Sequence, residues 1–466
     1  MDTVINRRTT LVAIAAAAGT IVRQEASAQS APATPSPTLT TLPDTPAGQQ
    51  LQWGIDVING EVPQPDTEEI EQHFSETFLA LLSAEKLQEL FTQFSAQAAP
   101  ISRIQITGIP VPLALNVIVN VKGNQSIAIS ITVEEAAPNK IVSLTFAPYS
   151  SAPPATPTLT GWSDLESVLS AAGSIYAIHA AEISSNGEAT IIHETNPETV
   201  LAIGSDFKLY VLGALSTKIE AGELSWDQTL TVTDEVKSFP SGVTQNELSG
   251  TKISIDELSR RMISISDNTA ADMLIDAVAR ESCETALATQ GNSDPARTTP
   301  FLKTREMFTL KVSGDDARLQ RYITAGTDVR RDILAQMEGE PLPSLSAAAA
   351  WTTPIDIDTV EWFATAADLG RAIDWLWDMG ATCGLEPIRD ILTINPGMPY
   401  DDKTWNRVAF KGGSEIGVLS LCWLLERNDG RRFLFSCGVN NPDKPISEET
   451  VVLAAAGAFP LLAAVK

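Results

Sequence analysis

Hydrophobic and polar positions in the first half of the chain predict helices followed by strands. Hydrophobic residues recur at mostly three-to-four spacing over 67–96, which predicts a long helix, and a shorter helical pattern surrounds Trp53. Four runs rich in β-branched residues then predict strands at 101–109, 113–121, 126–133 and 141–146. Helices followed by an antiparallel sheet are typical of a small α+β domain, which we place at 49–147.

The second half of the chain has a different order of elements. A predicted helix at 163–172 leads into strands at 174–183 and 189–194, and a mostly helical stretch continues to about residue 281. Strands return at 408–411, 417–425 and 432–439, and an apolar helix follows them. Strands at both ends of this region predict one antiparallel sheet with an inserted helical lobe, and therefore a second α+β domain at 161–466.

Two segments rich in Pro, Thr, Ser and Ala separate these parts of the chain. We predict flexible linkers at 29–48, before the first domain, and at 148–160, between the two domains. The first domain has no ionisable cluster typical of catalysis, and its only histidine, His73, is predicted to be a plain surface residue. The role of the first domain stays open: this domain can form a homodimer, dock on the second domain or hold that domain away from the cell surface.

Residues 1–28 have the features of an export signal. Arg7 and Arg8 precede an uncharged run over 9–22, and small residues at 26–28 offer a cleavage site. The segment partly resembles a bacterial twin-arginine signal. Its apolar core is too short for a membrane span, and no span is predicted elsewhere. We therefore expect a bacterial protein that is secreted, periplasmic or held at the cell surface.

Composition excludes some partners. The chain has 466 residues, of which 44 % are hydrophobic and 19 % charged, as in an ordinary globular protein. Its net charge of −26 repels phosphate backbones and anionic lipid, so nucleic acid is not an expected partner. Four cysteines are too few for a disulfide scaffold. Cys422 and Cys437 flank a predicted hairpin, where they either face each other across it or are buried free thiols, and the sequence leaves their disulfide state open.

Three short motifs occur in order within the second domain. The segment 205–208 reads Ser-Asp-Phe-Lys, a Ser-Asp-Asn at 266–268 begins 61 residues after its serine, and a Lys-Gly-Gly-Ser at 411–414 begins 145 residues later. Each motif is weak evidence by itself. The ordered set is strong evidence, because it is the three-part pattern of serine hydrolases with a serine nucleophile and a lysine base.

Ser205 and Lys208 have the properties of a nucleophile and its base. A serine at the start of a helix can direct its backbone N–H at a developing oxyanion, where the helix dipole also favours negative charge. Lys208 lies one helical turn later on the same face, in an otherwise apolar stretch. Burial there lowers a lysine pKa and makes the amine a general base. The alternative for Ser205 is a plain helix N-cap.

The other two motifs supply proton transfer and substrate binding. Ser266 can pass a proton between a lysine and a leaving group, and Asn268 can hold a substrate amide or orient Lys208. Lys411, at the end of its predicted strand, can bind a substrate carboxylate or support Ser266. The substrate-binding residues at this strand edge are Gly412 and Gly413, which permit close approach, and Ser414, whose N–H can be a second oxyanion donor. The alternatives are a turn with a helix N-cap at 266–268 and a loop lysine beside a bulge.

The ordered motifs resemble those of the class A β-lactamases and their penicillin-binding relatives over roughly 161–466. The two-domain layout resembles the branch whose N-terminal domain is steroid-isomerase-like or cystatin-like, which includes the β-lactamase-fold protein of the clavulanic-acid cluster. The resemblance implies that Ser205 is acylated, that Lys208 and Ser266 transfer protons, and that Lys411 holds a substrate carboxylate. It implies no cofactor and no metal.

Three departures from that family affect the expected activity. The usual Lys-Thr-Gly or Lys-Ser-Gly reads Lys-Gly-Gly here, so Gly412 lacks the hydroxyl that helps bind a β-lactam carboxylate. The chain lacks the Glu-x-x-Leu-Asn segment whose glutamate, in that family, activates the water for deacylation. Glu306 lies in the corresponding region and is either a substitute base or a solvated or salt-bridged helix residue. The stretch between Ser266 and Lys411 is longer than usual, which indicates an insertion. Four tryptophans in it either pack in the core or line the pocket: Trp351, Trp362, Trp375 and Trp377.

These observations predict a secreted serine hydrolase that acts through an acyl-enzyme on a small β-lactam, ester or amide. Acylation machinery is complete and deacylation machinery is not, so a slow β-lactamase or an esterase fits best. The alternatives are a DD-peptidase acting on cell-wall peptides and a non-catalytic penicillin-binding sensor. A Ser-His-Asp hydrolase is disfavoured, because the chain has three histidines and no Gly-x-Ser-x-Gly around Ser205. No group of residues has the spacing of metal ligands.

Overall fold

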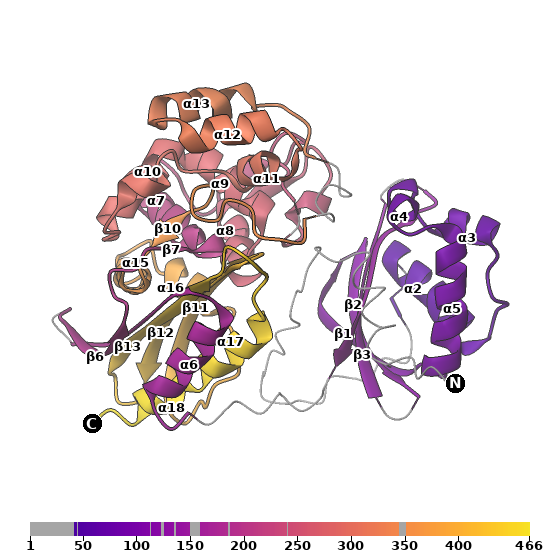
Figure 1. The fold of residues 1–466 in the computed structure, drawn as a ribbon, viewed down its shortest axis with the longest axis horizontal. Coiled ribbons are helices and arrows are strands. Elements are labelled where there is room, and N and C mark those ends of the chain that lie inside the picture. The colour runs from indigo at the N-terminus through magenta and orange to yellow at the C-terminus, as the bar shows by residue number, and fades with distance from the viewer. Residues whose placement is uncertain are drawn as a thin grey trace. The chain divides into compact units, whose positions relative to one another are not determined.

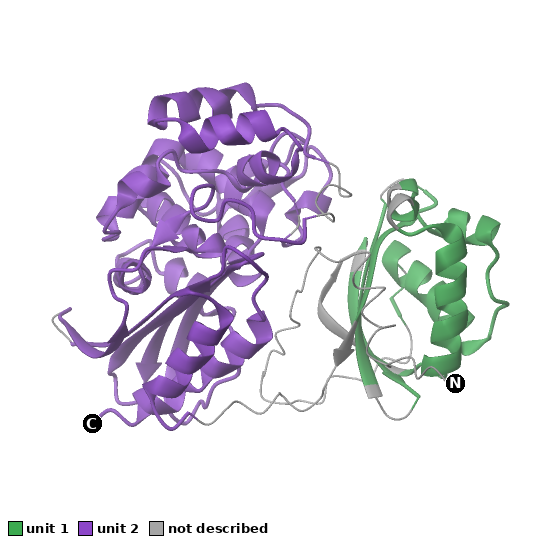
Figure 2. Ribbon diagram, in the orientation of Figure 1, with its two compact units in different colours: residues 1–155, 348–350 green, residues 156–347, 351–466 purple. Residues whose placement is uncertain are grey.

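A computed structural model describes residues 42–43, 45–111, 113–122, 125–134, 137–149, 159–184, 187–239, 241–343 and 351–466. The chain forms two compact units (Figure 2): unit 1 comprises residues 1–155 and 348–350, and unit 2 comprises residues 156–347 and 351–466. The predicted export signal and most of both predicted linkers lie outside the described residues, so their limits stay predictions. The described end of the first predicted linker is already helical, because α2 begins at Pro46.

Unit 1 contains helices followed by an antiparallel sheet (Figure 1). The strands pair in the order β1-β2-β3-β4, with bounds Ser102–Val111, Ala114–Val121, Gln125–Val133 and Ile141–Tyr149. Helix α2 (Pro46–Asn59) packs on β2 and β3, and its apolar side chains share one core with those of the sheet. The predicted order of elements is therefore correct for this unit, while its likeness to steroid isomerases or cystatins stays a prediction.

The single long helix predicted over 67–96 is wrong. Three helices occupy the region: α3 (Thr67–His73), α4 (Glu76–Leu81) and α5 (Ala84–Ala98). Ser75 and Ser83 each accept a hydrogen bond from the backbone N–H three residues later, and so each begins a new helix. Phe74 forms a β-bridge with Ile141 between the first two helices. The hydrophobic spacing continues across these breaks, and for that reason periodicity alone suggested one helix.

His73 is half-buried and not a plain surface residue. Its ring stacks on Trp53 with centroids 3.7 Å apart, and its Nδ1 lies 2.7 Å from Gln50 Oε1. Burial lowers the pKa of this histidine, against the opposing charge of Glu69. The hydrophobic pattern did not show this environment, because it arises between α2 and α3.

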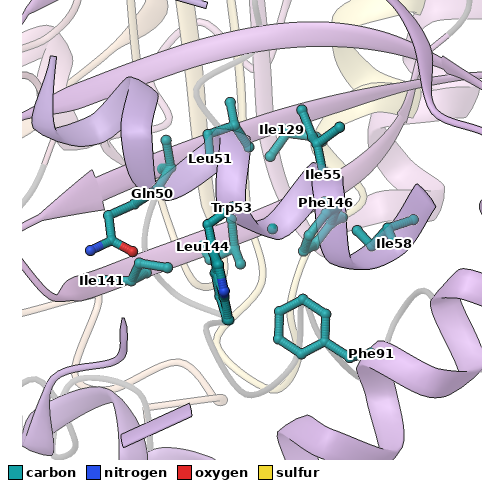
Figure 3. A pocket seen from close by; sticks show the side chains of 12 residues that line it. Gln50, Leu51, Trp53, Ile55, Ile58, Phe91, Ile129, Ile141, Leu144 and Phe146 are labelled. Atoms are coloured by element: carbon teal, nitrogen blue, oxygen red, sulfur yellow. The ribbon is translucent and has the colours of Figure 1, made fainter. Parts of the chain in front are cut away.

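A small cavity lies inside unit 1, between α2, α5 and the sheet (Figure 3). Its volume is about 20 Å³, and its lining is mostly apolar, with Leu51, Ile55, Phe91 and Phe146 among the residues around it. That volume is close to the space of one water molecule. We therefore interpret it as a packing gap, too small to hold an organic ligand.

Unit 2 is built on a five-stranded antiparallel sheet that contains strands from both of its ends (Figure 1). The strand order is β11-β12-β13-β5-β6, with bounds Trp405–Glu415, Val418–Arg427, Arg432–Asn440, Ile175–Ile183 and Ala189–Thr195. Helices α6 (Trp162–Ala172), α17 (Glu448–Ala456) and α18 (Ala458–Ala463) share a core with one face of the sheet. The other face packs on α15 (Ala366–Met379) and on the helical lobe.

The helical lobe lies between β6 and β11 in the sequence. Its helices, after the short helix η1 (Gly204–Phe207), are α7 (Lys208–Glu220), α8 (Ile255–Ser264), α9 (Asn268–Val278), α10 (Arg280–Thr289), α11 (Thr304–Val312), α12 (Asp316–Thr324), α13 (Thr327–Gln336), α15 and α16 (Pro387–Thr393). The remaining short elements are β7 (Leu201–Ala202), β8 (Thr229–Thr231), η2 (Thr244–Asn246), β9 (Lys252–Ser254), η3 (Pro295–Thr298) and β10 (Phe363–Ala364). The predicted α+β fold with an inserted helical lobe is confirmed.

The predicted hairpin places two cysteines on opposite faces of the sheet. Cys437 pairs with Leu421, whereas Cys422 pairs with Ser436, one register position away. Because successive residues of a strand point to opposite faces, the two thiols cannot meet. Both are buried free cysteines, as is Cys283, and Cys383 is an exposed one.

Candidate active site

Ser205 lies on a tight turn between β7 and α7. Gly204 has φ +47°, and a side chain at this position would lie 2.8 Å from the backbone nitrogen of Ser414. The turn continues as η1, which places half-buried Ser205 one turn before Lys208. Phe207 stacks on Trp362 with ring centroids 3.9 Å apart, so aromatic packing holds the turn in place.

Lys208 is fully buried and connects the first two sequence motifs. Its Nζ lies 3.0 Å from Ser205 Oγ, 2.6 Å from the carbonyl oxygen of Ser266, 3.2 Å from Ser266 Oγ and 2.7 Å from Asn268 Oδ1. Burial lowers the pKa of Lys208 well below its ordinary value, and the charge of Lys411 lowers it further. An amine with a depressed pKa at hydrogen-bond distance from a serine can accept the proton of that serine.

The Ser-Asp-Asn motif is the connection between α8 and α9. Ser266 has φ +58°, a left-handed conformation that non-glycine residues adopt rarely. Asp267 stabilises this connection: its carboxylate caps α9 and accepts hydrogen bonds from the N–H groups of Val243 and Thr244. The motif is therefore both an N-cap and a positioned serine, so the structural and catalytic readings of the sequence do not exclude each other.

Lys411 also contacts the Ser266 hydroxyl. Its Nζ lies 3.0 Å from Ser266 Oγ and also donates to the carbonyl oxygen of Gly412. The side chain is buried, which lowers the pKa of Lys411 to about 8 although the charge of Asp206 opposes that shift. Ser266 Oγ thus lies between two lysines, Lys208 and Lys411, that come from distant parts of the sequence.

Lys411 is in the interior of a strand, so its predicted place at a strand end is wrong. Strand β11 continues to Glu415, and its last residues pair with β12 through backbone hydrogen bonds that need no side chain. Gly413 is required for another reason: a Cβ there would lie 2.0 Å from the carbonyl oxygen of Ile203 and 2.4 Å from the nitrogen of Ser205. Close approach of β11 to η1 brings exposed Ser414 beside the turn that carries Ser205.

Glu306 is held in a structural position. Both oxygens of its carboxylate accept hydrogen bonds from Arg280, at 2.6 and 2.9 Å, and one also accepts from the N–H of Lys303. Of the two readings that the sequence left open, the geometry favours the salt-bridged helix residue. Among the described residues, no carboxylate forms a hydrogen bond or ion pair with Ser205, Lys208, Ser266 or Lys411.

Sequence reasoning missed Asp206, although it is part of the first motif. The residue is fully buried, and burial raises the pKa of Asp206 to about 8, with the charge of Lys411 acting in the opposite direction. A charged residue between a serine and a phenylalanine, at the start of an apolar helix, was the available signal.

Sequence reasoning also missed a cluster of buried charged residues at the end of β11. Lys311 Nζ lies 2.6 Å from Glu415 Oε1, and the two side chains are 0 % and 5 % exposed. Burial and the neighbouring Glu415 raise the pKa of Glu361 well above its ordinary value.

The four tryptophans between Ser266 and Lys411 pack in the protein interior. Trp351, Trp362 and Trp377 are buried, and half-buried Trp375 packs against the core that contains Trp362 and Trp377.

Comparison with family models agrees with the resemblance that the ordered motifs predicted. Residues 162–378 match the model described as Beta-lactamase enzyme family, and residues 42–137 match the model described as ORF 12 gene product N-terminal. The first of these matches lies within unit 2 and agrees with the resemblance to the class A β-lactamases that the motifs predicted. The particular two-domain branch stays a prediction. Among curated proteins, no relative matches the chain.

Several solved structures are similar to part of the chain. A β-lactamase from Sphaerobacter thermophilus has 19 % identity and a TM-score of 0.45, over 66 % of this chain and 99 % of its own. A β-lactamase from Desulfarculus baarsii has 15 % identity and a TM-score of 0.45, over 66 % and 100 %. A mutant of PBP-A, solved as an acyl-enzyme complex with penicillin G, has 14 % identity and a TM-score of 0.43, over 65 % and 96 %.

Proposed function

We propose that this protein is a serine hydrolase that forms an acyl-enzyme at Ser205 with a small ester, amide or β-lactam and releases the product slowly. The observation that carries the proposal is the hydrogen-bond chain from Ser205 through Lys208 and Ser266 to Lys411. The export signal predicted from the sequence would place the protein outside the cytoplasm of a bacterium. In the described part of the chain, no helix is long and apolar enough to cross a membrane.

Acylation would begin at Ser205. Lys208 in its neutral form accepts the hydroxyl proton, and Ser205 Oγ bonds to the carbonyl carbon of the substrate. The backbone N–H groups of Ser205 and Ser414 are the proposed oxyanion donors, since β11 passes next to η1. As the carbon–oxygen or carbon–nitrogen bond breaks, Ser266 gives its proton to the leaving group and regains one from Lys208. Lys411 keeps the Ser266 hydroxyl oriented throughout.

Asn268 has two roles in this proposal. Its Oδ1 accepts a hydrogen bond from Lys208, and its Nδ2 donates to the carbonyl of Phe239, which fixes the amide. The amide therefore orients the base, and its second proposed role is contact with a substrate amide. Strand β11, with Gly412 and Gly413, is an edge strand of its sheet, and its backbone is the proposed docking place for an extended substrate.

Deacylation requires a base that activates water. Glu306 is paired with Arg280, and no other described carboxylate is bound to the serine–lysine network. We therefore propose slow turnover. The same observation favours one further candidate function, a penicillin-binding sensor whose acylated state is the signal. A DD-peptidase remains the alternative for a cell-wall peptide substrate.

Intact-mass spectrometry of the purified protein tests the proposal. The protein is incubated with a penicillin, a cephalosporin and a simple aryl ester, and its mass is followed from minutes to hours. A transient adduct with product release supports the hydrolase, and a stable adduct supports the sensor. Ser205→Ala should form no adduct, while the surface control Ser170→Ala, whose hydroxyl only bonds to the carbonyl of Ser167, should behave as wild type. Full hydrolytic activity in Ser205→Ala would disprove the mechanism.

A further inference from the structure

The two proposed oxyanion donors belong to different elements. The N–H of Ser205 is in η1, and the N–H of Ser414 is near the end of β11. Both can stabilise one oxyanion only if each stays about 2.7–3.1 Å from the same oxygen atom. Strand β11 is an edge strand, with β12 as its neighbour in the sheet. Pairing with β12 therefore does not by itself keep Ser414 beside η1.

An ion pair anchors the end of β11 to the helical lobe. Glu415 directly follows Ser414, and its Oε1 accepts a hydrogen bond of 2.6 Å from Lys311 Nζ of α11. Both side chains are almost completely buried. The same ammonium group lies 5.7 Å from the centroid of the Trp351 ring. A charge-assisted hydrogen bond is stronger away from water, so the pair ties the residue after Ser414 to α11.

The turn that carries Ser205 is tied to the start of the same helix. The carbonyl of Trp362 accepts a hydrogen bond of 3.0 Å from the N–H of Ile203, and its ring stacks on Phe207. The indole Nε1 of Trp362 donates to the carbonyl of Leu302 at 3.1 Å, just before α11 begins. Trp362 therefore connects both sides of η1 to the segment that leads into α11.

Helix α9 holds the first turn of α11 in turn. The buried carboxylate of Asp272 accepts hydrogen bonds from the N–H groups of Thr304, at 2.7 Å, and Arg305, at 2.9 Å. Helix α9 begins at Asn268, which bonds to Lys208. Helix α11 is thus attached to the proposed catalytic network by its first turn and to β11 by its last turn. A continuous helix between these attachments fixes one relative to the other.

We propose that Lys311 and Glu415 are positioning residues, which hold the N–H of Ser414 at the distance from the N–H of Ser205 that an oxyanion requires. The inference rests on the proposed acyl-enzyme function, and neither residue contacts the substrate in it. Without the pair, the end of β11 could move away from η1 while the nucleophile and its base stay in place. Loss of one oxyanion donor slows acyl transfer by about 10²–10³-fold, so a displaced donor should cost part of that factor.

A matched pair of acyl donors isolates the oxyanion: 4-nitrophenyl phenylacetate and its thiono analogue, in which sulfur replaces the carbonyl oxygen. In both, Ser205 Oγ bonds to the acyl carbon and 4-nitrophenolate leaves. Negative charge develops on oxygen in one and on sulfur in the other, and sulfur is larger and a weaker hydrogen-bond acceptor. The ratio of the two acylation rates therefore reports on the oxyanion donors more than on the nucleophile or its base.

The rates are measured by intact mass for the full-length protein and for Glu415→Gln, which keeps the side-chain shape and removes the charge. Burial raises the pKa of Glu415, so the comparison is made at pH 8, where a higher pH favours the ionised carboxylate. Wild type should favour the oxygen ester by at least about tenfold. In Glu415→Gln this ratio should fall by at least about fivefold, because the oxygen ester reacts more slowly while the thiono ester changes by less than about twofold.

Asp374→Asn is the matched control. It converts a carboxylate to an amide in a partly buried pair with Arg432, which joins α15 to β13 and does not involve β11. The ratio in this variant should equal that of wild type. Thermal melting of each variant shows whether it is folded, so that a loss of stability is separated from a change in the ratio.

An unchanged ratio in folded Glu415→Gln would overturn the inference, as would a wild-type protein that does not prefer the oxygen ester. If Glu415→Gln does not fold, the double variant Lys311→Met/Glu415→Leu replaces it, because removing both partners leaves neither charge of the pair uncompensated. The same fall is expected there, and an unchanged ratio would again contradict the positioning role. No acylation of wild-type Ser205 by either ester would defeat the proposed function as well, whereas acylation with an unchanged ratio would defeat only the role of the pair.

Discussion

At the scale of single residues, the site depends on one hydroxyl placed between two amines. Ser266 Oγ lies 3.2 Å from Lys208 Nζ and 3.0 Å from Lys411 Nζ. Both lysines are buried, and burial lowers the pKa of each, so a neutral amine is accessible at moderate pH. The two lysines have different neighbours, since Lys208 contacts the proposed nucleophile, whereas Lys411 contacts Ser266 and the carbonyl of Gly412. We therefore assign the base to Lys208.

Replacing Lys208 tests that assignment. Lys208→Met keeps most of the buried volume and removes the base, so Ser205 acylation should slow by about 10²–10⁴-fold. Stopped-flow or intact-mass measurements with an aryl ester check this rate. Lys218→Met, at an exposed ion pair with Glu223, should acylate normally. An acylation rate in Lys208→Met within a few-fold of wild type would show that another group accepts the proton.

The pH dependence of acylation has a defined sign. Acylation needs neutral Lys208, so its rate should rise as pH increases through the lowered pKa of Lys208, which lies well below 10.5. The charge of Lys411 contributes to that lowering, so Lys411→Gln should raise the Lys208 pKa and move the rise to higher pH. A pH–rate profile for both proteins measures the shift independently of any loss in maximal rate. A midpoint that stays in place or moves to lower pH would contradict the assignment.

At the scale of elements, the site is made by the contact between η1 and β11. The contact depends on two glycines that do different things. Gly204 has a positive φ and turns the chain into η1, while Gly413 leaves room for the backbone of residues 203–206. Gly412 faces away from this contact, toward the side chains of Phe410 and Leu421. The two neighbouring glycines of β11 are therefore not equivalent.

Alanine substitutions should separate the two glycines. In Gly413→Ala, the added methyl group would meet backbone atoms at 2.0–2.6 Å, which cannot move without displacing η1. We expect acylation to be lost and stability to fall by at least about 1–3 kcal/mol. In Gly412→Ala, the nearest atom, at 2.8 Å, is the end of the Phe410 ring, which can move. This variant should keep its activity within a few-fold. Thermal melting and ester-acylation rates check both, and equal effects would contradict the packing argument.

At the scale of the whole molecule, unit 2 joins its sheet and its helical lobe through buried charges as well as through apolar packing. Lys311 from α11 pairs with Glu415 from β11, and Glu361 lies beside them. Removing one partner of a buried pair costs more than losing a surface pair, because the remaining charge has no compensation. Most ion pairs elsewhere in the described chain are partly exposed, and such pairs contribute little.

Lys311→Met should therefore destabilise the protein by about 3–5 kcal/mol near pH 8. The effect should shrink toward pH 5, because burial raises the pKa values of Glu361 and Glu415 and protonation removes the uncompensated charge. A carboxylic acid whose pKa is raised on folding contributes stability that is complete below its unfolded value and is lost as pH rises through its folded value. Urea unfolding at the two pH values measures this. Lys218→Met, at an exposed pair, should change stability by less than about 1 kcal/mol at both. A pH-independent loss in Lys311→Met would show that lost packing, not charge, is responsible.

The sequence by itself predicted the order of helices and strands in both units and named the residues of the proposed site. Runs rich in β-branched residues predicted the strands of both sheets, because such side chains pack well on a buried sheet face. Three ordered motifs named Ser205, Lys208, Ser266 and Lys411, because acyl transfer by a serine and a lysine needs those residue types at those spacings. Hydrophobic periodicity did not predict the helix ends at Ser75 and Ser83, which are set by N-capping side chains. One helix can end and another begin without interrupting the hydrophobic spacing.

Only the tertiary structure decided the electrostatics of the site. That Ser266 contacts two lysines, that Asp206 is fully buried, and that Glu306 pairs with Arg280 all depend on segments far apart in the chain. The tertiary structure also decided that β11 continues past Lys411. The need for Gly413 in that strand comes from the close approach of η1 and not from any local sequence pattern. Charge compensation and desolvation are properties of a three-dimensional neighbourhood, and one sequence does not specify that neighbourhood directly.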